Sequence, residues 1–470
     1  MNYVNNSTLI RRELLSKLSG LLLETKTEEI DRIPLEMFPK GGKSVRCCIY
    51  KDRAMIKYRL IALLGHSIED EKDELKKLSE YAEESFDREK PGSPFLTVID
   101  EACSSCVKVN YVVTDACQGC VARPCMMNCP KDAIEFVNGR AHIKHEECIN
   151  CGICLKECPY HAIIYMPVPC EEACPVDAIS KDEHGKEKID FTKCNYCGKC
   201  MRSCPFGAIM ERSQISDLIK YLLSDKKTVA MVAPSIVGQF SASLGQIITA
   251  LKTLGFDEVI EVAEGAEITT EKETKEWVER MEKGEAFMTT SCCPAWVETV
   301  EKHLPELKSY VSDTRSPMRY AGEIAREEHP EAHTVFIGPC IAKRKEAWTD
   351  DTVDLVLSIE ELGAMFIASK IDVQKMEASE LKSISSESRG YAMSGGVAHA
   401  VVSEAKSDMI EVVQIDGLNK QSIKELKRFT NKCPGNFVEV MSCEGGCIAG
   451  PSVISNPKLA SRQLKKMLGQ

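Results

Sequence analysis

The residues best suited to chemistry are cysteines in three loops near the C-terminal end of the chain. They are Cys292 with Cys293, Cys340, and Cys443 with Cys447. Each loop follows a short β-like run, at residues 286–290, 334–337 and 436–441, and helix-like stretches separate the runs. Since loops at the carboxyl ends of strands in an open α/β sheet converge on one crevice, we expect these thiols to meet there. Thiolates gathered in this way hold iron–sulfur clusters.

A second group of cysteines, 16 of the 24 in the chain, lies between residues 103 and 204. Two runs have the full bacterial ferredoxin spacing C-x2-C-x2-C-x3-C-P, and a third has two extra residues in its middle gap. The three runs are Cys148, Cys151, Cys154 and Cys158; Cys194, Cys197, Cys200 and Cys204; and Cys117, Cys120, Cys125 and Cys129. The hexapeptide Cys-Pro-x-x-Ala-Ile occurs four times, which indicates an internal repeat. Zinc is the alternative metal, but zinc sites usually pair two separated C-x2-C knuckles, so we expect 4Fe–4S clusters.

A fourth cluster in this region requires scattered ligands. Cys170 and Cys174, in the sequence Pro-Cys-x3-Cys-Pro, look like the second half of a ferredoxin motif. In paired ferredoxin motifs the fourth cysteine crosses to the other cubane. That rule adds Cys158 to the Cys117 run, Cys129 to the Cys148 run and Cys174 to the Cys194 run. Cys170 and Cys204 then remain, and Cys103 with Cys106 is the one unassigned C-x2-C pair. The alternative is three clusters, with Cys103 and Cys106 free or binding something else.

The composition restricts the partners and the compartment. A net charge of -11 disfavours nucleic acid as the main partner, because phosphate binding requires basic patches. The crowded cysteines of this 470-residue chain do not resemble a small secreted disulfide scaffold. We find no cleavable signal peptide and no run of 18 apolar residues, so we expect no membrane span. The sequence therefore predicts a cytoplasmic protein whose thiols are metal ligands. Cys47, Cys48 and Cys433 match no motif and are expected to be ordinary buried thiols.

The chain divides into three parts by composition. Residues 1–100 are expected to be mainly helical, and their role is not evident from the sequence. Residues 101–215 form a ferredoxin-like domain, and residues 220–470 alternate strand-like and helix-like segments. The expected elements are helices at 9–23, 68–86 and 243–254, strands at 228–233 and 258–262, a loop at 89–94, and a segment at 46–64 that fits either strand or helix. The predicted fold is α+β and α/β multidomain, with a ferredoxin-like iron–sulfur domain followed by a two-lobed α/β catalytic domain.

The three C-terminal loops resemble those of the iron-only (FeFe) hydrogenases, and the resemblance extends over roughly residues 100–465. It implies an FeFe-hydrogenase catalytic domain that performs the reversible reaction 2H+ + 2e- to H2. It also implies an H-cluster, in which four cysteines hold a 4Fe–4S cubane and one of them bridges to a two-iron subsite with carbon monoxide, cyanide and a dithiolate amine. By resemblance the ligands are Cys293, Cys340, Cys443 and Cys447, with Cys447 as the bridge.

The same resemblance assigns roles to residues around the cofactor. Lys343 would donate a charge-assisted hydrogen bond to a cyanide. The cofactor pocket would be lined by Pro234, Ser235, Met318, Gly338 and Met441. A proton relay would run through Cys292, Glu273, Ser312 and Glu276. From the residues alone, Thr270 and Glu273 fit a helix capping box and Glu276 fits a solvated helix face. Together with the cysteine loops the relay is favoured, and Glu273 can serve both purposes.

Some positions depart from the commonest pattern of that family. Ala295, Gly338 and Met318 stand where Gly, Met and Gln are usual, and residues 449–451 replace a Gly run. These changes resemble the group B branch and alter the shell that tunes potential and access. One alternative function is an H2 sensor, although no PAS-like or kinase-like segment is evident after residue 460. The other is an iron–sulfur assembly protein, which has no need of Lys343 or a relay. Expected partners are ferredoxin or a similar small electron carrier and the hydrogenase maturation proteins.

Overall fold

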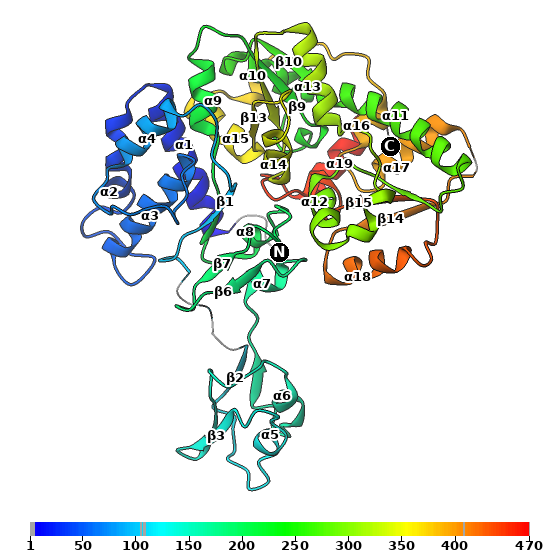
Figure 1. The fold of residues 1–470 in the computed structure, drawn as a ribbon. Helices are drawn as coiled ribbons and strands as arrows, with labels where there is room; N and C mark the ends of the chain where they lie inside the picture. Colours follow the sequence, from blue (N-terminus) through cyan, green and yellow to red (C-terminus); the bar gives the residue numbers. More distant parts are fainter. Residues whose placement is uncertain (1–4, 104–105, 107–109, 408, 470) are drawn as a thin grey trace.

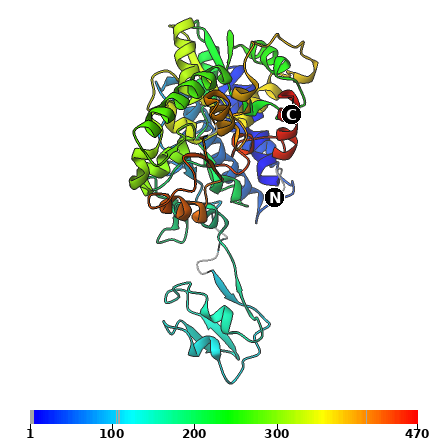
Figure 2. The same cartoon turned by 90° about the vertical axis from the view of Figure 1, so that its right-hand side faces the viewer.

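The computed structural model describes residues 5–103, 106, 110–407 and 409–469. An N-terminal helical region packs against one side of a large α/β body, and a small cysteine-rich lobe projects from that body (Figures 1 and 2). Across the described residues, none of the helices combines the length and the apolar character that a membrane span requires.

The N-terminal region is built around α1. Its helices are α1 (Asn6–Leu23), the 3-10 helix η1 (Thr27–Arg32), α2 (Ile33–Met37), α3 (Ile49–Leu63) and α4 (Leu78–Asp87). Leu14, Leu18 and Leu22 recur at helical spacing and are fully buried. Helix α1 also packs on α15 (Ile359–Ala368), where Arg11 and Arg12 both pair with buried Glu360. The helix expected at 9–23 is confirmed, and the ambiguous segment 46–64 is mostly helix.

The helix expected at 68–86 is wrong in its first half, because α4 begins at Leu78. In the preceding segment the Glu71 carboxylate accepts from the Asp73 amide at 2.8 Å, and the Asp73 carboxylate accepts from the Leu75 amide at 2.9 Å. Such local bonds from acidic side chains compete with helical hydrogen bonds. The segment therefore stays irregular until Glu80 accepts from the Lys77 amide at 3.3 Å and starts the helix.

The cysteine-rich part consists of two modules, one inserted into the other. The outer module contains β1 (Leu96–Val98), α7 (Pro169–Ala173), β6 (Ile179–Lys181), β7 (Glu187–Ile189), α8 (Lys199–Ser203) and β8 (Ile209–Glu211). The inner module, the projecting lobe of Figure 1, contains β2 (Tyr111–Val113), α5 (Pro124–Met127), β3 (Ile134–Val137), β4 (Arg140–Ile143), α6 (Ile153–Glu157) and β5 (Ile163–Tyr165). In each module the first strand pairs antiparallel with the last, and the two middle strands pair with each other. Residues 111–165 thus interrupt an outer module that begins before them and ends after them.

The four Cys-Pro-x-x-Ala-Ile repeats share one local conformation. The fourth residue of each repeat has a left-handed backbone, with φ between 49° and 57°; these residues are Asp132, His161, Asp177 and Gly207. The alanine that follows donates its backbone N–H to the cysteine sulfur of the same repeat at 3.2–3.4 Å. The isoleucine then begins a strand, which is β3, β5, β6 or β8. The sequence repeat is therefore a structural repeat.

The C-terminal α/β part contains two parallel sheets. The first has the strand order β10-β9-β12-β13, from β9 (Thr228–Val232), β10 (Glu258–Glu261), β12 (His333–Ile337) and β13 (Leu355–Leu357). The second has the order β11-β15-β14, from β11 (Met288–Thr289), β14 (Val412–Asp416) and β15 (Phe437–Met441). All of these pairs are parallel, with Val232 beside Ile337 and Thr289 beside Val438. The expected α/β alternation is confirmed.

The connecting elements of this part are mainly helices. They are α9 (Ile215–Leu222), η2 (Pro234–Ile236), α10 (Leu244–Leu254), α11 (Val262–Glu282), α12 (Pro294–His303), η3 (Pro305–Tyr310), α13 (Pro317–Glu328), α14 (Ala342–Trp348), η4 (Val373–Lys375), α16 (Ser386–Gly390), α17 (Gly396–Ala405), α18 (Lys420–Phe429), η5 (Cys447–Ala449) and α19 (Pro457–Met467). The three strands that precede the cysteine loops do not share one sheet: β12 belongs to the first, whereas β11 and β15 belong to the second. The thiols therefore meet between two sheets rather than at the edge of one.

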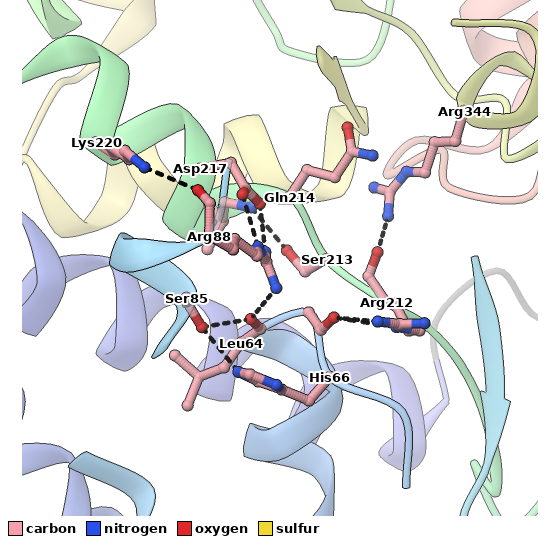
Figure 3. A network of polar contacts seen from close by, with 12 residues as sticks. Leu64, His66, Ser85, Arg88, Arg212, Ser213, Gln214, Asp217, Lys220 and Arg344 are labelled. Atoms are coloured by element: carbon pink, nitrogen blue, oxygen red, sulfur yellow. Dashed lines mark hydrogen bonds and ion pairs between the residues drawn. The ribbon is translucent and has the colours of Figure 1, made fainter. Parts of the chain in front are cut away.

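A polar network joins the N-terminal region to the C-terminal α/β part (Figure 3). Arg88 binds Asp217 at 2.7 Å, and Arg212 donates to the Gly65 carbonyl at 3.0 Å. Arg344, at the start of α14, is 1% exposed and pairs with Glu361 at 2.7 Å and Glu211 at 3.3 Å. It also donates to the Arg212 carbonyl. Buried charges that are paired in this way hold α14 against the segment that follows β8.

Candidate functional site

Four cysteines from the three predicted loops form one group. Cys293 caps the N-terminus of α12, Cys340 follows β12, and Cys443 and Cys447 follow β15. Burial, together with the charges of Cys293 and Cys447 and against the opposing charge of Lys343, raises the pKa of Cys340 to about 12. The pKa of Cys443 is raised well above its ordinary value by burial and by the charges of Cys340, Cys447 and Cys293. Each of these thiols therefore lies within the electrostatic range of the others.

Two glycines between the last two cysteines shape the loop. Gly445 and Gly446 both have left-handed backbones, with φ of 86° and 89°. A Cβ at Gly446 would lie 2.5 Å from the Ser394 amide nitrogen and 2.7 Å from the Ala392 carbonyl oxygen. Only glycine fits so close to another backbone. The packing at Gly446 therefore fixes the position of Cys447, the next residue.

Lys343 lies beside this group with all three of its N–H donors engaged. Its ammonium donates to Glu346 at 2.6 Å, to the Ser316 hydroxyl at 2.9 Å and to the Cys292 carbonyl at 3.4 Å. Burial alone would lower the pKa of Lys343, but the Glu346 carboxylate outweighs burial and raises it. The lysine is thus a fixed positive charge. The long bond to the Cys292 carbonyl is the one that a bound anion would replace with least loss.

The residues predicted to line a cofactor pocket lie on both sides of the group. Met318 packs with Ala233 and Phe336 in the core of the first sheet, whereas Met441 packs against Cys292 and Cys293. Pro234 and Ser235 form η2, at the carboxyl end of β9. Ser235 is 1% exposed, and its hydroxyl has no partner among the described residues. Such an orphaned buried hydroxyl fits a site built for a polar group that binds there.

Gly338 is enclosed by its neighbours. A Cβ at this position would lie 2.6 Å from the ring of Phe336 and 3.3 Å from the Cβ of Ala233. Phe336 therefore occupies space beside Gly338, and a methionine there would require the ring to move.

The four residues of the predicted relay occupy two contrasting environments. Glu273 is fully buried in the middle of α11, and neither carboxylate oxygen has a hydrogen-bond partner among the described residues. Burial, with the nearby charge of Glu276, raises the pKa of Glu273 to about 8. Burial and the Glu273 charge likewise raise the pKa of Cys292 well above its ordinary value. Both of these groups are held in their neutral forms at neutral pH.

The outer end of the relay is polar. The Glu276 carboxylate accepts from the Ser312 hydroxyl at 2.6 Å, from the Thr314 hydroxyl at 2.8 Å and from the Asp313 amide at 2.9 Å, and it pairs with Arg280 at 2.7 Å. Burial would raise the pKa of Glu276, but these bonds outweigh it and lower the pKa. Glu276 is therefore an ionised carboxylate three residues beyond a protonated one.

The capping-box interpretation of Thr270 and Glu273 is wrong. Helix α11 begins at Val262, so both residues lie well inside it. The Thr270 hydroxyl instead bonds the Ala266 carbonyl and the Tyr391 hydroxyl, each at 2.8 Å. The solvated-face interpretation of Glu276 is also wrong, because its side chain is 17% exposed and tied to four donors.

Two acidic residues near the site escaped sequence reasoning. Glu439 is fully buried in β15, accepts from the Gly395 and Ala398 amides at 2.7 and 2.8 Å, and adds to the raised pKa of Cys447. Its sequence signal is a lone acid between Val438 and Val440 in an otherwise apolar strand. Glu346 lies three residues after Lys343, the spacing of an i,i+3 pair on a helix.

The 16 cysteines of the modules gather into sets of four. Burial raises the pKa of Cys125, with the charges of Cys158, Cys120 and Cys117 adding to it. Burial raises the pKa of Cys154 to about 11, with Cys148, Cys151 and Cys129 adding. Burial raises the pKa of Cys200, and the charges of Cys197, Cys194 and Cys174 add most to this effect. Burial also raises the pKa of Cys170, with the charges of Glu187, Cys204, Cys106 and Cys103 adding to it. The first three groupings are the sets that the crossing rule predicts, and the last contains the four cysteines that the rule leaves unassigned.

The remaining three cysteines are less buried than expected. Cys47 and Cys48 are exposed, with their sulfurs 3.9 Å apart, and Cys433 is half-buried. The prediction of buried thiols is therefore wrong for Cys47 and Cys48. Cys48 is the N-cap of α3, so it lies just before the helix and outside the part of it that packs on its neighbours.

Known protein families match three parts of the chain. Residues 226–451 match the iron only hydrogenase large subunit, C-terminal domain; residues 141–164 match a 4Fe-4S binding domain; and residues 164–215 match the LdpA Fe-S cluster-binding domain. Iron hydrogenase 1 of Clostridium pasteurianum is 31% identical over 406 residues, which cover 72% of this chain and 70% of that protein. The chain belongs to the iron-only hydrogenase family.

The chain has further, weaker similarities. The cytosolic Fe-S cluster assembly factor NAR1 of Eremothecium gossypii is 23% identical over 324 residues, which cover 53% of this chain and 72% of that protein. A solved [FeFe]-hydrogenase structure concerned with oxygen inactivation of the H cluster is 19% identical, with a TM-score of 0.44, over 54% of this chain and 88% of that one. The iron-only hydrogenase match spans both parallel sheets of the C-terminal part and the four-cysteine group, and the Fe-S matches span cysteines of both modules. The chain therefore has a hydrogenase-like domain and binds iron–sulfur clusters rather than zinc.

Proposed function

We propose that this protein is an FeFe hydrogenase that catalyses 2H+ + 2e- to H2 reversibly. In this proposal Cys293, Cys340, Cys443 and Cys447 hold the cubane of an H-cluster, and Cys447 bridges to the two-iron subsite. When bound, that cofactor supplies the hydrogen chemistry, while the protein binds, orients and shields it. The four-thiol group, the unpartnered Ser235 hydroxyl and the Lys343 charge fit such a group.

The observation that most supports catalysis is the buried acid Glu273. Burying a carboxyl group without partners is costly, and a protein that only holds a cubane gains nothing from it. A pKa of about 8 keeps Glu273 mostly protonated at neutral pH yet able to release its proton near that pH. Efficient general acids and bases have pKa values near the working pH. Glu273 is therefore suited to passing protons rather than to supporting the fold.

The neighbouring residues extend this function in both directions. The neutral Cys292 thiol lies between the ligand Cys293 and Glu273, so it can hold a proton at its Sγ beside the cluster site. At the other end the Ser312 hydroxyl donates to the ionised Glu276 carboxylate. Protons thus have a sequence of exchangeable groups from the site toward the surface. Lys343 contributes a fixed positive charge that attracts and orients an anionic group bound next to Cys340.

The competing function is that of an iron–sulfur assembly or H2-sensing protein. The similarity to the assembly factor of Eremothecium gossypii favours the first of these. An assembly protein of this kind holds cubanes but no two-iron subsite, so it differs from the enzyme in cofactor as well as in activity, whereas an H2 sensor would differ from it in turnover.

Infrared spectroscopy of protein produced together with hydrogenase maturation proteins separates the two. We expect carbonyl and cyanide bands, together with H2 production from reduced methyl viologen. Cys447→Ala removes the attachment point of the subsite, so it should abolish both while the accessory clusters remain. Cys433→Ala, at a half-buried thiol outside every set, is the matched control. Matured wild-type protein without these bands would contradict the hydrogenase proposal.

We further propose four accessory 4Fe–4S clusters. The least expected one has the ligands Cys103, Cys106, Cys170 and Cys204. The nested modules support it: without residues 111–165, only eight residues separate Cys106 from Cys170, so the pair Cys103 and Cys106 and the pair Cys170 and Cys174 belong to one module. The backbone amide of Glu187 also donates to the Cys103 sulfur at 3.4 Å, in the way that cluster sulfurs are commonly held.

Iron content tests this cluster. Five cubanes, including that of the H-cluster, contain about 20 irons at four per cubane. The double variant Cys103→Ser, Cys106→Ser should lose about four of them. The pair Cys47→Ser, Cys48→Ser is the control, because these exposed thiols belong to no set. An unchanged iron content in the first variant would reject the fourth accessory cluster.

We also propose the biological setting that the family resemblance implies. The protein works in the cytoplasm, exchanges electrons with ferredoxin or a similar small carrier, and receives its two-iron subsite from hydrogenase maturation proteins. Placement in the group B branch is supported by Gly338, since Phe336 fills the space beside it. The three-domain division at residues 1–100, 101–215 and 220–470 is retained, with the outer module extending back to β1.

A further inference from the structure

A large basic cleft opens beside the four-cysteine group. Its volume is about 1360 Å³, and it lies between α8, α19 and the loop around Cys443. Cys197 and Cys443 both line it. These two residues belong to different sets, the first to the Cys174, Cys194, Cys197 and Cys200 set and the second to the catalytic group. The cleft therefore reaches from the surface to the junction of two proposed clusters.

The outer wall of the cleft is a stripe of exposed cations on α19. The four residues are Lys458, Arg462, Lys465 and Lys466. Their spacing places them on one side of the helix, while Ala460 and Leu464 on the other side are fully buried. Within the described part of the chain, no carboxylate forms an ion pair with any of the four.

The inner wall is also cationic. Lys199 donates to the Leu418 carbonyl, and Arg202 donates to the Ala449 and Gly450 carbonyls at 3.2 Å. Asp416 and Glu444 are the two acidic residues among the lining residues, and Asp416 is engaged with the Gly445 amide at 2.7 Å. Six cations and two carboxylates thus line a cleft in a protein whose net charge is -11. Charge of one sign concentrated in a cleft attracts partners of the opposite sign.

We propose that this cleft is the docking site of a small acidic electron-carrier protein, which delivers electrons directly to the cluster of the Cys197 set. The inference rests on the proposed hydrogenase function and names where its electron partner binds. The stripe extends over nine residues of α19, about 13 Å at 1.5 Å per residue, which matches a protein surface better than a single small anion.

The competing docking site is the inner module, which also contains two proposed clusters. Residues 111–165 contain six acidic and five basic residues, so that lobe is almost neutral. It offers an acidic carrier little electrostatic attraction. The cations of the α19 stripe, in contrast, face solvent and have no ion-pair partner among the described residues. Docking at α19 also bypasses the inner module and shortens the route to the catalytic group.

Charge reversal on the stripe tests the proposal with two electron donors. The double variant Lys465→Glu, Lys466→Glu should lower kcat/KM for H2 production with a reduced bacterial 2[4Fe–4S] ferredoxin roughly tenfold or more at low salt. The rate with reduced methyl viologen, which needs no docking site, should not change. Lys458→Glu, Arg462→Glu is the second test pair. Lys283→Glu, Lys308→Glu is the matched control, because both lysines are exposed and make no ion pair in the described residues.

Three results would overturn the proposal. The first is an unchanged ferredoxin rate in both stripe variants, and the second is an equal loss in the Lys283 and Lys308 control. The third is that Cys151→Ser, in the inner module, removes the ferredoxin rate while the stripe variants retain it. If inorganic phosphate binds wild type but not the stripe variants, while ferredoxin binds both equally, the cleft is a small-anion site and the proposal is likewise overturned.

Failure of the hydrogenase function is distinguishable from failure of docking. If wild-type protein produces no H2 from methyl viologen, the hydrogenase function fails. Fluorescence titration with the same ferredoxin still measures docking in that case. Binding that weakens in the stripe variants and with added salt supports the cleft as the docking site; binding that is indifferent to both refutes it.

Discussion

The proton affinity of Glu273 has a consequence that can be measured directly. A pKa of about 8, against the ordinary 4.5, corresponds to about 5 kcal/mol between the protonated and ionised forms at ~1.4 kcal/mol per pH unit. The folded protein binds this proton more tightly than the unfolded chain does. The protonated side chain therefore imposes no penalty below about pH 4.5, and folding stability falls as the pH rises toward 8.

Glu273→Gln removes this titration while keeping the shape of the side chain. Its unfolding free energy, relative to wild type, should increase across the window from pH 4.5 to 8 by up to about 5 kcal/mol. Its H2 production from methyl viologen should fall by ~10²–10⁴, the usual effect of losing a general acid–base group. The variant is thus expected to be more stable at alkaline pH and nearly inactive.

Infrared difference spectroscopy reports the protonation state itself. The spectrum of wild type minus Glu273→Gln should contain the C=O band of a protonated carboxyl group, and the band should disappear with a midpoint near pH 8. Glu276→Gln is the matched control three residues away: its carboxylate has a lowered pKa, so its difference spectrum should contain no such band in this range. A Glu273 band that is already lost by about pH 5, close to the ordinary pKa of a glutamate, would refute the reasoning.

Two further substitutions test other parts of the site. Cys292→Ala should retain all clusters and lower H2 turnover by ~10²–10⁴ or more; near-normal turnover would mean that protons leave by another route. Gly446→Ala should cost at least ~1–2 kcal/mol for its left-handed backbone, and its clash with Ser394 should displace Cys447 and reduce iron at the catalytic group. Gly284→Ala is the control, since its φ is 79° but nothing lies within 4 Å of its added Cβ. Equal losses of iron in the two glycine variants would contradict the close-packing argument.

The two carboxylates of α11 differ because of their surroundings, not their sequence. Glu273 and Glu276 are three residues apart on one helix. The Ser291 amide and the Ser312 hydroxyl lower the pKa of Glu273 less than burial raises it, whereas Glu276 accepts well-formed bonds from four donors. Environments that push two pKa values apart are how proteins assign acid and base roles to the same residue type. Glu276→Gln should also disturb the fold more than Glu273→Gln, because Glu276 holds Ser312, Thr314 and Arg280. A capping role would have made Glu273 the more important of the two for the fold. Glu273 lies inside α11 and caps nothing, so this expectation is wrong.

Local chemistry was predictable because local spacing determines it. The tight C-x2-C-x2-C loops, the strand after each Ala-Ile and the Ser243 cap before α10 all follow from neighbours in sequence. The capping-box error has the same origin, because it relied on local spacing alone. The pattern Thr270-x-x-Glu273 marks a helix start only if a helix begins there, whereas α11 begins at Val262. The exposure of Cys47 and Cys48 was mispredicted because tertiary contacts decide whether a side chain is buried, and a short sequence does not reveal those contacts.

The assembly of elements was less predictable because it depends on distant pairing. The strands before the three cysteine loops look alike in sequence, but only backbone pairing assigns β12 to one sheet and β11 and β15 to another. Two sheets whose carboxyl ends face each other enclose a group on more sides than one sheet does. That geometry explains how a Lys343 on α14 and a Cys292 after β11 come to share a hydrogen bond across the site.

The nested modules show how an insertion can make one cysteine motif unrecognisable in the sequence. Cys106 and Cys170 are separated by 63 residues, so the pattern that is obvious in the inner module appears as two unrelated halves in the outer one. The structure reunites the halves because β1 pairs with β8 around the insertion, as β2 pairs with β5 within it. An insertion is tolerated where the ends of the inserted unit lie close together, and the pairing of β2 with β5 brings those ends together. The inner module therefore occupies an insertion point at which the two halves of the outer module still meet, because β1 pairs with β8 on either side of it.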